Sequence, residues 1–284
     1  MKRQNFRFSH PLRVRWVEVD MQKIVFNAHY LMYFDTAISD YWRALALPYE
    51  EAMHMLGGDL YVKKASIEFH ASAHFDDKLD VALRCDRVGN ASMGFSGAIF
   101  RGDELLTSEL IYVFADPATQ TSKPVPDVLR QVLQAFEAGQ PSYKIKIGSW
   151  AELGEDAAQV RTEVFVHEQK IPVEMEWDEA DKTALHAVAY NGLGQAIGTA
   201  RLLEHTPQTA KVGRMAVKRI LRGSRIGRDL LSVLMDSARQ RGYQEVMLHA
   251  QRSAQEFYER TGFLVRGEPF EEVSIPHIEM FITF

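Results

Sequence analysis

In the first half of the chain, one long segment has apolar residues at helical spacing, and several other segments alternate apolar with polar residues. Apolar residues recur at helical spacing from Tyr30 to Leu45. A short alternating run at residues 12–16 precedes this segment and predicts a half-buried strand. Further strand-like runs follow it at 61–75, 79–88, 92–101 and 104–115. Because an antiparallel sheet must cover its apolar face, this order predicts a sheet wrapped around the single long helix.

The second half mixes helices and strands in a different order. A helix is expected near 156–169, followed by an acidic loop at 173–181. After it we expect a hairpin through 186–190 and 196–203, a strand at 211–217, a helix from 226 to 238 and a strand at 245–250. Between the halves lie a turn-rich loop at 116–124, a short helix at 125–136 and a linker at 138–142. The chain is therefore expected to be α+β, with domains at 1–138 and 142–284.

Length and composition are typical of a globular protein with two domains, since the chain has 284 residues, 46% hydrophobic and 25% charged. The net charge of −5 argues against general binding to nucleic acid. Cys85 is the single cysteine, so no intrachain disulfide can form, which fits a reducing cytosol. The basic start lacks the apolar core of a signal peptide, and no apolar run reaches the roughly 20 residues of a membrane helix. These features predict a soluble cytoplasmic protein with no membrane partner.

The segment Arg-Gly-Ser-Arg-Ile-Gly at 222–227 lies between an expected strand and an expected helix. Amide groups at a helix N-terminus have no intrahelical acceptor and carry partial positive charge, so they bind phosphate. Gly223 and Gly227 allow a tight turn, and Arg222 and Arg225 add positive charge. Taken alone, the loop is also typical of an ordinary basic surface turn. The residues around it decide between the two interpretations.

Those residues resemble the GNAT acetyltransferases, whose loop Gln/Arg-x-x-Gly-x-Gly/Ala grips the pyrophosphate of coenzyme A. Arg222 and Gly227 match the ends of this loop, whereas Arg225 stands at the middle glycine, where we expect altered loop geometry without loss of binding. Residues 253–263 look like the family's ending Ala-x-x-Phe-Tyr-x-x-x-Gly-Phe, and 161–169 and 274–277 resemble one largely uncharacterised branch. Ser253 and Glu256 also form a capping-box pattern, which predicts a helix start there.

The GNAT resemblance covers nearly all of 142–284 and implies an α/β domain with a mixed sheet that binds acetyl-CoA. The strand at 213–217 corresponds to the one that hydrogen-bonds the pantetheine arm. The implied coenzyme-binding residues are Met215, Ala216, Val217, Arg222, Gly223, Ser224, Arg225, Ile226 and Gly227. Tyr258 corresponds to the tyrosine that protonates the departing thiolate, and a packed aromatic is the alternative.

The base that takes the amine proton stays open among Glu174, Glu176 and Asp178 of the acidic loop. This loop could instead attract a cationic amine or form a solvated acidic face. His186 and His249 fall in expected strands and are interpreted as structural histidines.

Near the N-terminus, Asp20 ends the first expected strand, and a loop leads from it into the long helix. A carboxylate facing a helix N-terminus can hydrolyse a thioester, because it attacks the carbonyl or activates water while backbone N–H groups stabilise the oxyanion. The alternative for Asp20 is a turn or helix-capping carboxylate. His70 and His74 are expected on the wet face of one strand, and without a third ligand they predict no metal site.

This loop resembles the hotdog-fold acyl-CoA thioesterases of the 4-hydroxybenzoyl-CoA thioesterase branch, with the signature Asp-x-x-Gly-(Ile/Val)-Val-(Tyr/Trp)-x-x-x-Tyr. Asp20, Ile24, Val25 and Tyr30 match it, Phe26 is a conservative aromatic, and Lys23 stands where the family has glycine. The resemblance extends over about 8–135. It implies that Asp20 is nucleophile or general base and that the Asn27 backbone N–H is an oxyanion donor. It also implies a homodimer or homotetramer paired through the hotdog domain, which the exposed edge of a single sheet favours as well.

Both halves thus point to thioesters of coenzyme A through separate residues. The leading hypothesis is a bifunctional enzyme whose N-terminal domain hydrolyses an acyl-CoA thioester and whose C-terminal domain transfers acetyl to an unidentified amine. A second hypothesis, favoured by Lys23, makes the hotdog domain an inactive dimerisation or acyl-CoA-sensing module. A third, supported by Arg225, makes the protein a regulator that binds coenzyme A without turnover.

Overall fold

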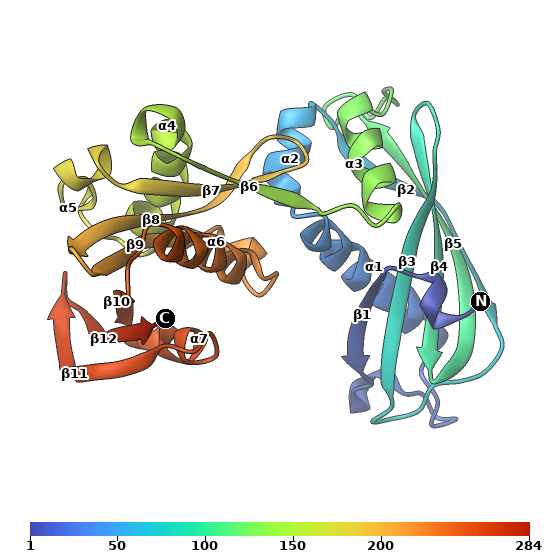
Figure 1. Cartoon of the computed structure of the whole chain (residues 1–284). Helices are drawn as coiled ribbons and strands as arrows, with labels where there is room; N and C mark the ends of the chain where they lie inside the picture. The colour runs from blue at the N-terminus through green and yellow to red at the C-terminus, as the bar shows by residue number, and fades with distance from the viewer. The chain divides into compact units, whose positions relative to one another are not determined.

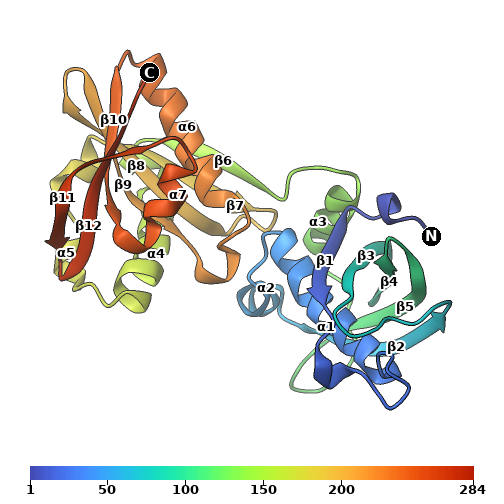
Figure 2. The same ribbon diagram turned by 90° about the horizontal axis from the view of Figure 1, so that it is seen from below.

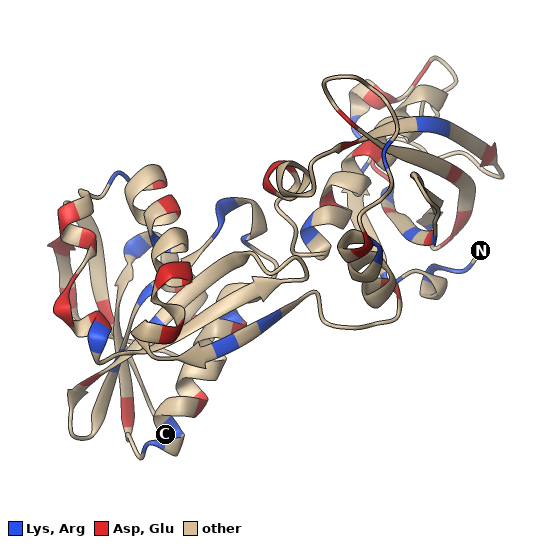
Figure 3. Ribbon diagram, turned by 90° about the horizontal axis from the view of Figure 1, so that it is seen from above, with Lys and Arg blue, Asp and Glu red and all other residues tan.

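A computed structural model describes all 284 residues and divides the chain into two compact units, Met1–Ser142 and Tyr143–Phe284 (Figure 1). Acidic and basic residues are interspersed on the elements of each unit (Figure 3). None of the helices combines the length and the apolar character needed to cross a membrane.

The first unit is a five-stranded antiparallel sheet curved around one long helix (Figure 2). Its strands are β1 (Phe8–Arg13), β2 (Asp59–Phe69), β3 (Lys78–Val88), β4 (Ser92–Arg101) and β5 (Asp103–Ala115), in the order β1-β3-β4-β5-β2. Its helices are α1 (Asn27–Ala44), α2 (Tyr49–Leu56) and α3 (Asp127–Glu137), with short 3-10 turns at Arg3–Asn5 and Trp16–Glu18. The expected sheet around a single long helix is confirmed.

The buried face of α1 fills the concave side of this sheet. The Tyr41 ring packs edge-on against Phe8 of β1 and Phe95 of β4, with ring centroids 5.4 Å apart in both pairs. Phe34 lies so close to β4 that a Cβ atom on Gly97 would sit 2.5 Å from its ring. Glycine at position 97 is therefore what lets the helix approach the sheet, since any larger residue would clash.

Two expectations for the first unit are wrong. The first strand ends at Arg13, because the Glu18 carboxylate accepts the Arg15 N–H and folds residues 16–18 into a turn that leaves Trp16 exposed. The strand expected at 61–75 ends at Phe69, because the N–H groups of His70 and Ala71 both donate to the Leu105 carbonyl and close the ladder. Hence His70 and His74 do not share a strand, and β2 is an edge strand largely exposed on both faces.

The second unit is built on a seven-stranded mixed sheet in the order β11-β12-β10-β9-β8-β7-β6. The strands are β6 (Tyr143–Gly148), β7 (Leu185–Asn191), β8 (Ala196–Thr206), β9 (Thr209–Val217), β10 (Glu245–Gln251), β11 (Leu264–Glu272) and β12 (Ile275–Thr283). The helices are α4 (Trp150–Arg161), α5 (Val173–Glu176), α6 (Ile226–Gln240) and α7 (Gln255–Glu259). Short turns lie at Glu179–Lys182, Arg219–Leu221 and Arg252–Ala254. Only β9 and β10 run parallel, which confirms the expected mixed sheet.

Two helix starts in this unit differ from expectation. The helix expected at 156 begins at Trp150, because Ser149 and Glu152 form a capping box. It continues past Arg161 as a π-helical segment, η3 (Thr162–Glu168), a geometry that often marks functional sites. The capping box expected at Ser253 does not form, because Ser253 lies in the preceding 3-10 turn and α7 begins at Gln255 without a side-chain cap.

Candidate functional sites

A cavity of about 600 Å³ opens in the second unit beside the last residues of β9. The pairing between the parallel strands β9 and β10 ends at Val212 and Leu248, so the backbone of 213–217 has no partner on its β10 side. Arg214 has a φ of 49°, and the β8–β9 register shifts between Thr199 and Arg201. This irregularity leaves amide and carbonyl groups free to hydrogen-bond a ligand that lies between the two strands.

Several expected coenzyme-binding residues line this cavity, namely Met215, Ala216, Val217 and Arg222. The other five, Gly223, Ser224, Arg225, Ile226 and Gly227, are not among the lining residues. The first three form the turn into α6, and the last two begin that helix. Arg225 is the N-cap residue of α6 and has a φ of 72°. This left-handed backbone, which normally favours glycine, costs an arginine about 1–2 kcal/mol. The position thus has a glycine-like conformation although it carries a long side chain.

Tyr258 also lies on the cavity wall. Its ring packs edge-on against Phe257 and Phe263, and its hydroxyl lies 3.8 Å from the Met215 sulfur. Burial raises the pKa of the Tyr258 phenol to about 12. The hydroxyl therefore stays protonated at neutral pH and can donate a proton to a thiolate formed beside Met215.

Arg222 is engaged by a residue that the sequence did not single out. Its two terminal nitrogens donate to the two carboxylate oxygens of Glu168, each at 2.7 Å, and its Nε donates to the Val217 carbonyl at 3.2 Å. Glu168 is the last residue of the π-helical segment. The motif indicated Arg222, but nothing in the local pattern pointed to a carboxylate 54 residues earlier.

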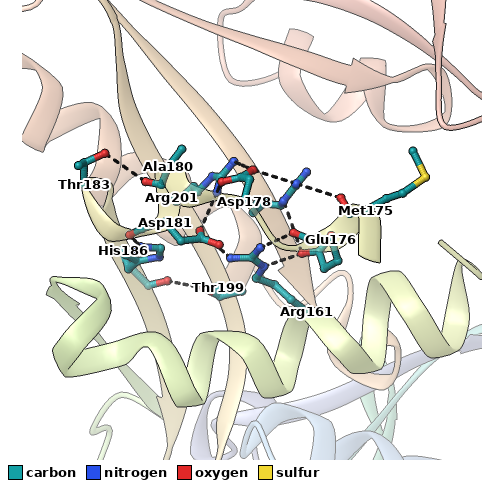
Figure 4. A network of polar contacts seen from close by, with 12 residues as sticks. Arg161, Met175, Glu176, Asp178, Ala180, Asp181, Thr183, His186, Thr199 and Arg201 are labelled. Atoms are coloured by element: carbon teal, nitrogen blue, oxygen red, sulfur yellow. Dashed lines mark hydrogen bonds and ion pairs between the residues drawn. The ribbon is translucent and has the colours of Figure 1, made fainter. Parts of the chain in front are cut away.

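The acidic loop turns inward and binds three arginines (Figure 4). The guanidinium of Arg161 donates to Glu176 at 2.5 Å and to Asp181 at 2.8 Å, and all three side chains are buried. Its central carbon also lies near two indole rings, 5.6 Å from the centroid of Trp150 and 4.7 Å from that of Trp177. A solvated acidic face is therefore the wrong interpretation for Glu176 and Asp181, and it holds for the exposed Glu174.

Asp178 completes the network from the cavity side. Arg201 donates to both of its oxygens at 2.7 Å, and Arg214 donates to one of them at 3.1 Å. The hydrogen bond from Arg201 lowers the pKa of Asp178. Burial raises the pKa of Glu176 despite its arginine neighbours. Glu176, Asp178 and Asp181 are thus balanced by Arg161, Arg201 and Arg214, so this network offers a cationic ligand in the cavity no unpaired negative charge.

The two histidines differ in their surroundings. His186 is fully buried, with Nε2 2.9 Å from the Asp181 carbonyl, which confirms a structural role. His249 has hydrogen-bond neighbours too, but it lines the cavity. Its Nδ1 lies 3.3 Å from Lys211 Nζ and 3.2 Å from Glu272 Oε2. No local pattern indicated this cluster, because its members come from β9, β10 and β11.

In the first unit, residues 20–24 form a tight turn that leads into α1. The Asp20 N–H donates to the Ile24 carbonyl and the Lys23 N–H donates to the Asp20 carbonyl, both at 2.9 Å. Lys23 has a φ of 64°, the left-handed conformation that favours glycine. Lysine at the family's glycine position therefore has a glycine-like backbone. Asn27 is the first residue of α1, where N–H groups have no intrahelical acceptor.

Two carboxylates, Asp20 and Glu18, precede α1 and differ in their burial and in the hydrogen bonds that they accept. One oxygen of Asp20 accepts the Gln22 N–H at 2.8 Å, and the residue remains partly exposed. Glu18, which sequence reasoning missed, is buried and accepts hydrogen bonds from Arg15 and from the Tyr33 hydroxyl at 2.8 Å. Glu18 therefore fixes the loop, whereas Asp20 can meet a ligand. No group of three or more His, Cys, Asp or Glu residues is arranged to hold a metal ion.

Comparison with known proteins agrees with this division. The model of a family described as "Acetyltransferase (GNAT) domain" matches residues 152–284, and that of the "Thioesterase superfamily" matches residues 22–108. The uncharacterized N-acetyltransferase YjcF of Bacillus subtilis is 34% identical over 126 residues, which cover 44% of this chain and 89% of the relative.

Solved structures resemble each unit separately. A putative N-acetyltransferase from Lactobacillus plantarum is 30% identical and covers 50% of this chain and 97% of its own, with a TM-score of 0.47. A 1,4-dihydroxy-2-naphthoyl-CoA thioesterase from Synechocystis is 18% identical and covers 45% of this chain and 95% of its own, with a TM-score of 0.41. By its family matches, the chain joins a hotdog domain of the thioesterase superfamily to a C-terminal domain that belongs to the GNAT acetyltransferases.

Proposed function

We propose that the chain is a bifunctional acyl-CoA enzyme, with thioester hydrolysis in the first unit and acetyl transfer from acetyl-CoA to an amine in the second. Both families act on thioesters of coenzyme A. The observation that carries the transferase is the shared cavity, which brings the unpaired backbone of β9, Arg222 and Tyr258 together. Met215–Val217 would bind the pantetheine arm, and Arg222 with the start of α6 would bind the pyrophosphate.

Acetyl transfer needs a base for the amine and an acid for the thiol. The amine nitrogen attacks the thioester carbonyl, the carbon–sulfur bond breaks, and Tyr258 gives its hydroxyl proton to the sulfur. Of the acidic-loop candidates, Glu174 does not line the cavity and Asp178 is held by Arg201 and Arg214. Glu176 lines the cavity, but Arg161 and Arg214 hold its carboxylate as well. We therefore assign no residue of this loop as the base, and the amine proton passes to water.

Hydrolysis in the first unit would use Asp20 and the N-terminus of α1. The Asp20 carboxylate attacks the thioester carbonyl or removes a proton from the attacking water. The Asn27 N–H, at the first position of α1, supports the negative oxygen that develops. The left-handed backbone of Lys23 supports this proposal, because the loop does not need glycine to adopt its turn.

A second candidate makes the first unit a dimerisation or acyl-CoA-sensing module without turnover. The bond between Asp20 and the Gln22 N–H favours it, since it makes this carboxylate a turn-stabilising group. In both versions we propose a homodimer or homotetramer formed through the hotdog unit. Strand β2 supports this assembly, because it is an edge strand with Val62 and Phe69 exposed.

The deciding experiment measures hydrolysis of short, long and aromatic acyl-CoAs by the wild-type protein, with no amine present. Asp20→Asn should abolish this hydrolysis and leave coenzyme A binding by the second unit intact. Tyr258→Phe serves as the matched control, since it should leave hydrolysis unchanged. A wild-type protein that binds coenzyme A but hydrolyses no thioester would refute the hydrolase and leave the second candidate.

A further inference from the structure

The cavity of the second unit extends beyond the residues proposed to hold coenzyme A. Lys211 lines it on β9, four residues before Met215 and therefore about 13 Å away along the strand. Arg222 lies on the other side of Met215 along the chain. If the proposed function is right, the thioester reacts near Met215, and the Lys211 end of the cavity receives the acceptor.

Negative charge for an ammonium group is scarce at this end. The carboxylates of Glu176 and Asp178 are bound by Arg161, Arg201 and Arg214. The remaining carboxylate on the cavity wall is Glu272, which already contacts His249. Charge pairing therefore argues against a polyamine or another purely cationic acceptor.

Lys211 has no carboxylate within ion-pair distance. Its Nζ contacts His249 Nδ1 at 3.3 Å, and the Glu272 carboxylate approaches that same ring nitrogen at 3.2 Å. A single nitrogen of a neutral ring either accepts from Lys211 or donates to Glu272, so one neighbour is always left without this bond. Glu272 is 48% exposed and can turn to water. Lys211 is less exposed than Glu272, so its ammonium group gains more from a new hydrogen-bond partner.

The surroundings of Lys211 also favour an anion. Arg201 and Arg214 line the same cavity and repel the ammonium charge. Burial lowers the pKa of Lys211 although Glu272 and Glu279 raise it, so these two carboxylates offset only part of the cost of burying its charge. A carboxylate bound there would offset more of that cost.

We propose that Lys211 binds a carboxylate of the acceptor, so that the acetylated amine belongs to the class of amino carboxylates. The ammonium of Lys211 holds the carboxylate, and the amino group at the other end of the acceptor faces the thioester near Met215. This inference rests on the proposed acetyl transfer and adds the acceptor class to it.

The first test compares acceptors that differ only by the carboxylate: 5-aminopentanoate with butylamine, 4-aminobutyrate with propylamine, and lysine with cadaverine. Thiol release from acetyl-CoA is followed with the full-length protein. We expect kcat/KM at least about tenfold higher for the carboxylate member of the best pair, since one well-placed charge-assisted hydrogen bond is worth about that factor. Equal or faster reaction of the partner lacking the carboxylate in every pair would overturn the proposal.

Variants then locate the effect. Lys211→Met should remove the preference by raising KM for amino carboxylates, and Lys211→Arg should keep most of it. The matched control is Lys144→Met, because Lys144 lies on β6 and does not line the cavity. A preference that survives Lys211→Met contradicts the assignment. A fall in kcat for every amine would make Lys211 a proton-transfer group and contradict it equally.

A binding measurement separates this inference from the proposed function. With coenzyme A present, the N-acetyl derivatives of the three pairs are titrated by calorimetry. We expect an N-acetylated amino carboxylate to bind, its uncharged counterpart to bind at least about tenfold more weakly, and Lys211→Met to abolish the difference. This result without any transfer would refute the transferase and keep the anion site. Transfer to amines with no discrimination between the derivatives would keep the transferase and refute the site.

Discussion

Arg222 and Glu168 form a two-point ion pair, with both nitrogen–oxygen distances at 2.7 Å. We propose above that Arg222 binds the pyrophosphate of coenzyme A. Glu168 therefore binds the same guanidinium that the pyrophosphate would bind. A bidentate partner of this kind uses the same guanidinium edge that a phosphate would use. On the proposed function, coenzyme A therefore displaces Glu168 or shares Arg222 with it, and this step involves the π-helical segment that ends at Glu168.

We predict that Glu168→Gln tightens binding of coenzyme A. The variant removes a competing negative charge while it keeps the size of the side chain. The pair is partly exposed, so the gain is expected to be about two- to fivefold in Kd, in the range of an exposed ion pair. Calorimetric titration measures it, with Glu256→Gln as control because the pair of Glu256 with Arg260 lies on the surface. Weaker binding by Glu168→Gln would show that Glu168 positions Arg222 and does not compete with the ligand.

Replacing Tyr258 by phenylalanine should lower kcat for acetyl transfer by about 100-fold and leave KM for acetyl-CoA within about twofold. General-acid catalysis contributes on this scale, and the ring that packs against Phe257 and Phe263 is retained. Steady-state kinetics with the best acceptor measures both constants. A loss that appears in KM alone would assign Tyr258 to packing against the ligand.

The fold followed closely from the sequence because its signals are local. The alternation of apolar and polar residues predicted the ends of β3, β4 and β5 to within a residue or two. The helical spacing of apolar residues from Tyr30 predicted α1. Errors arose where one polar contact redirected the chain. Glu18 caps the turn that ends the first strand early, and Ser149 with Glu152 starts α4 six residues before the expected start.

The candidate sites were harder to predict, because they depend on contacts between distant residues. Glu168 reaches Arg222 across 54 positions, and the partners of Lys211 come from strands that the sequence cannot align. The acidic loop was expected to face solvent or substrate, yet Arg161 draws it inward. The left-handed backbones of Lys23 and Arg225 could not be predicted either. The families have glycine at both positions, so a larger residue there suggested a changed turn.

The buried network makes Arg161 a determinant of stability. Arg161→Met should lower the free energy of unfolding of the second unit by about 3–5 kcal/mol, because Glu176 and Asp181 would keep their charges in a buried site without this partner. Chemical denaturation measures the change. Lys182→Met is the control, since it removes an exposed pair with Glu179 and should cost less than about 1 kcal/mol. A similar small loss in both variants would mean that Arg201 and Arg214 hold the loop without Arg161.

Acidification should destabilise the second unit through His186. Burial lowers the pKa of this ring, so between its folded value and the ordinary value of about 6.5 the folded chain binds fewer protons than the unfolded chain. The stabilisation is therefore complete above about pH 6.5 and is lost as the pH falls toward the folded pKa. Guanidinium denaturation at pH 7, 6 and 5 should show a steady decrease for the wild type and a shallower one for His186→Asn. His205→Asn, at an exposed position, should keep the wild-type slope. If His186→Asn keeps that slope as well, the acid sensitivity of this unit comes from other groups, and the neutral buried ring contributes nothing to it.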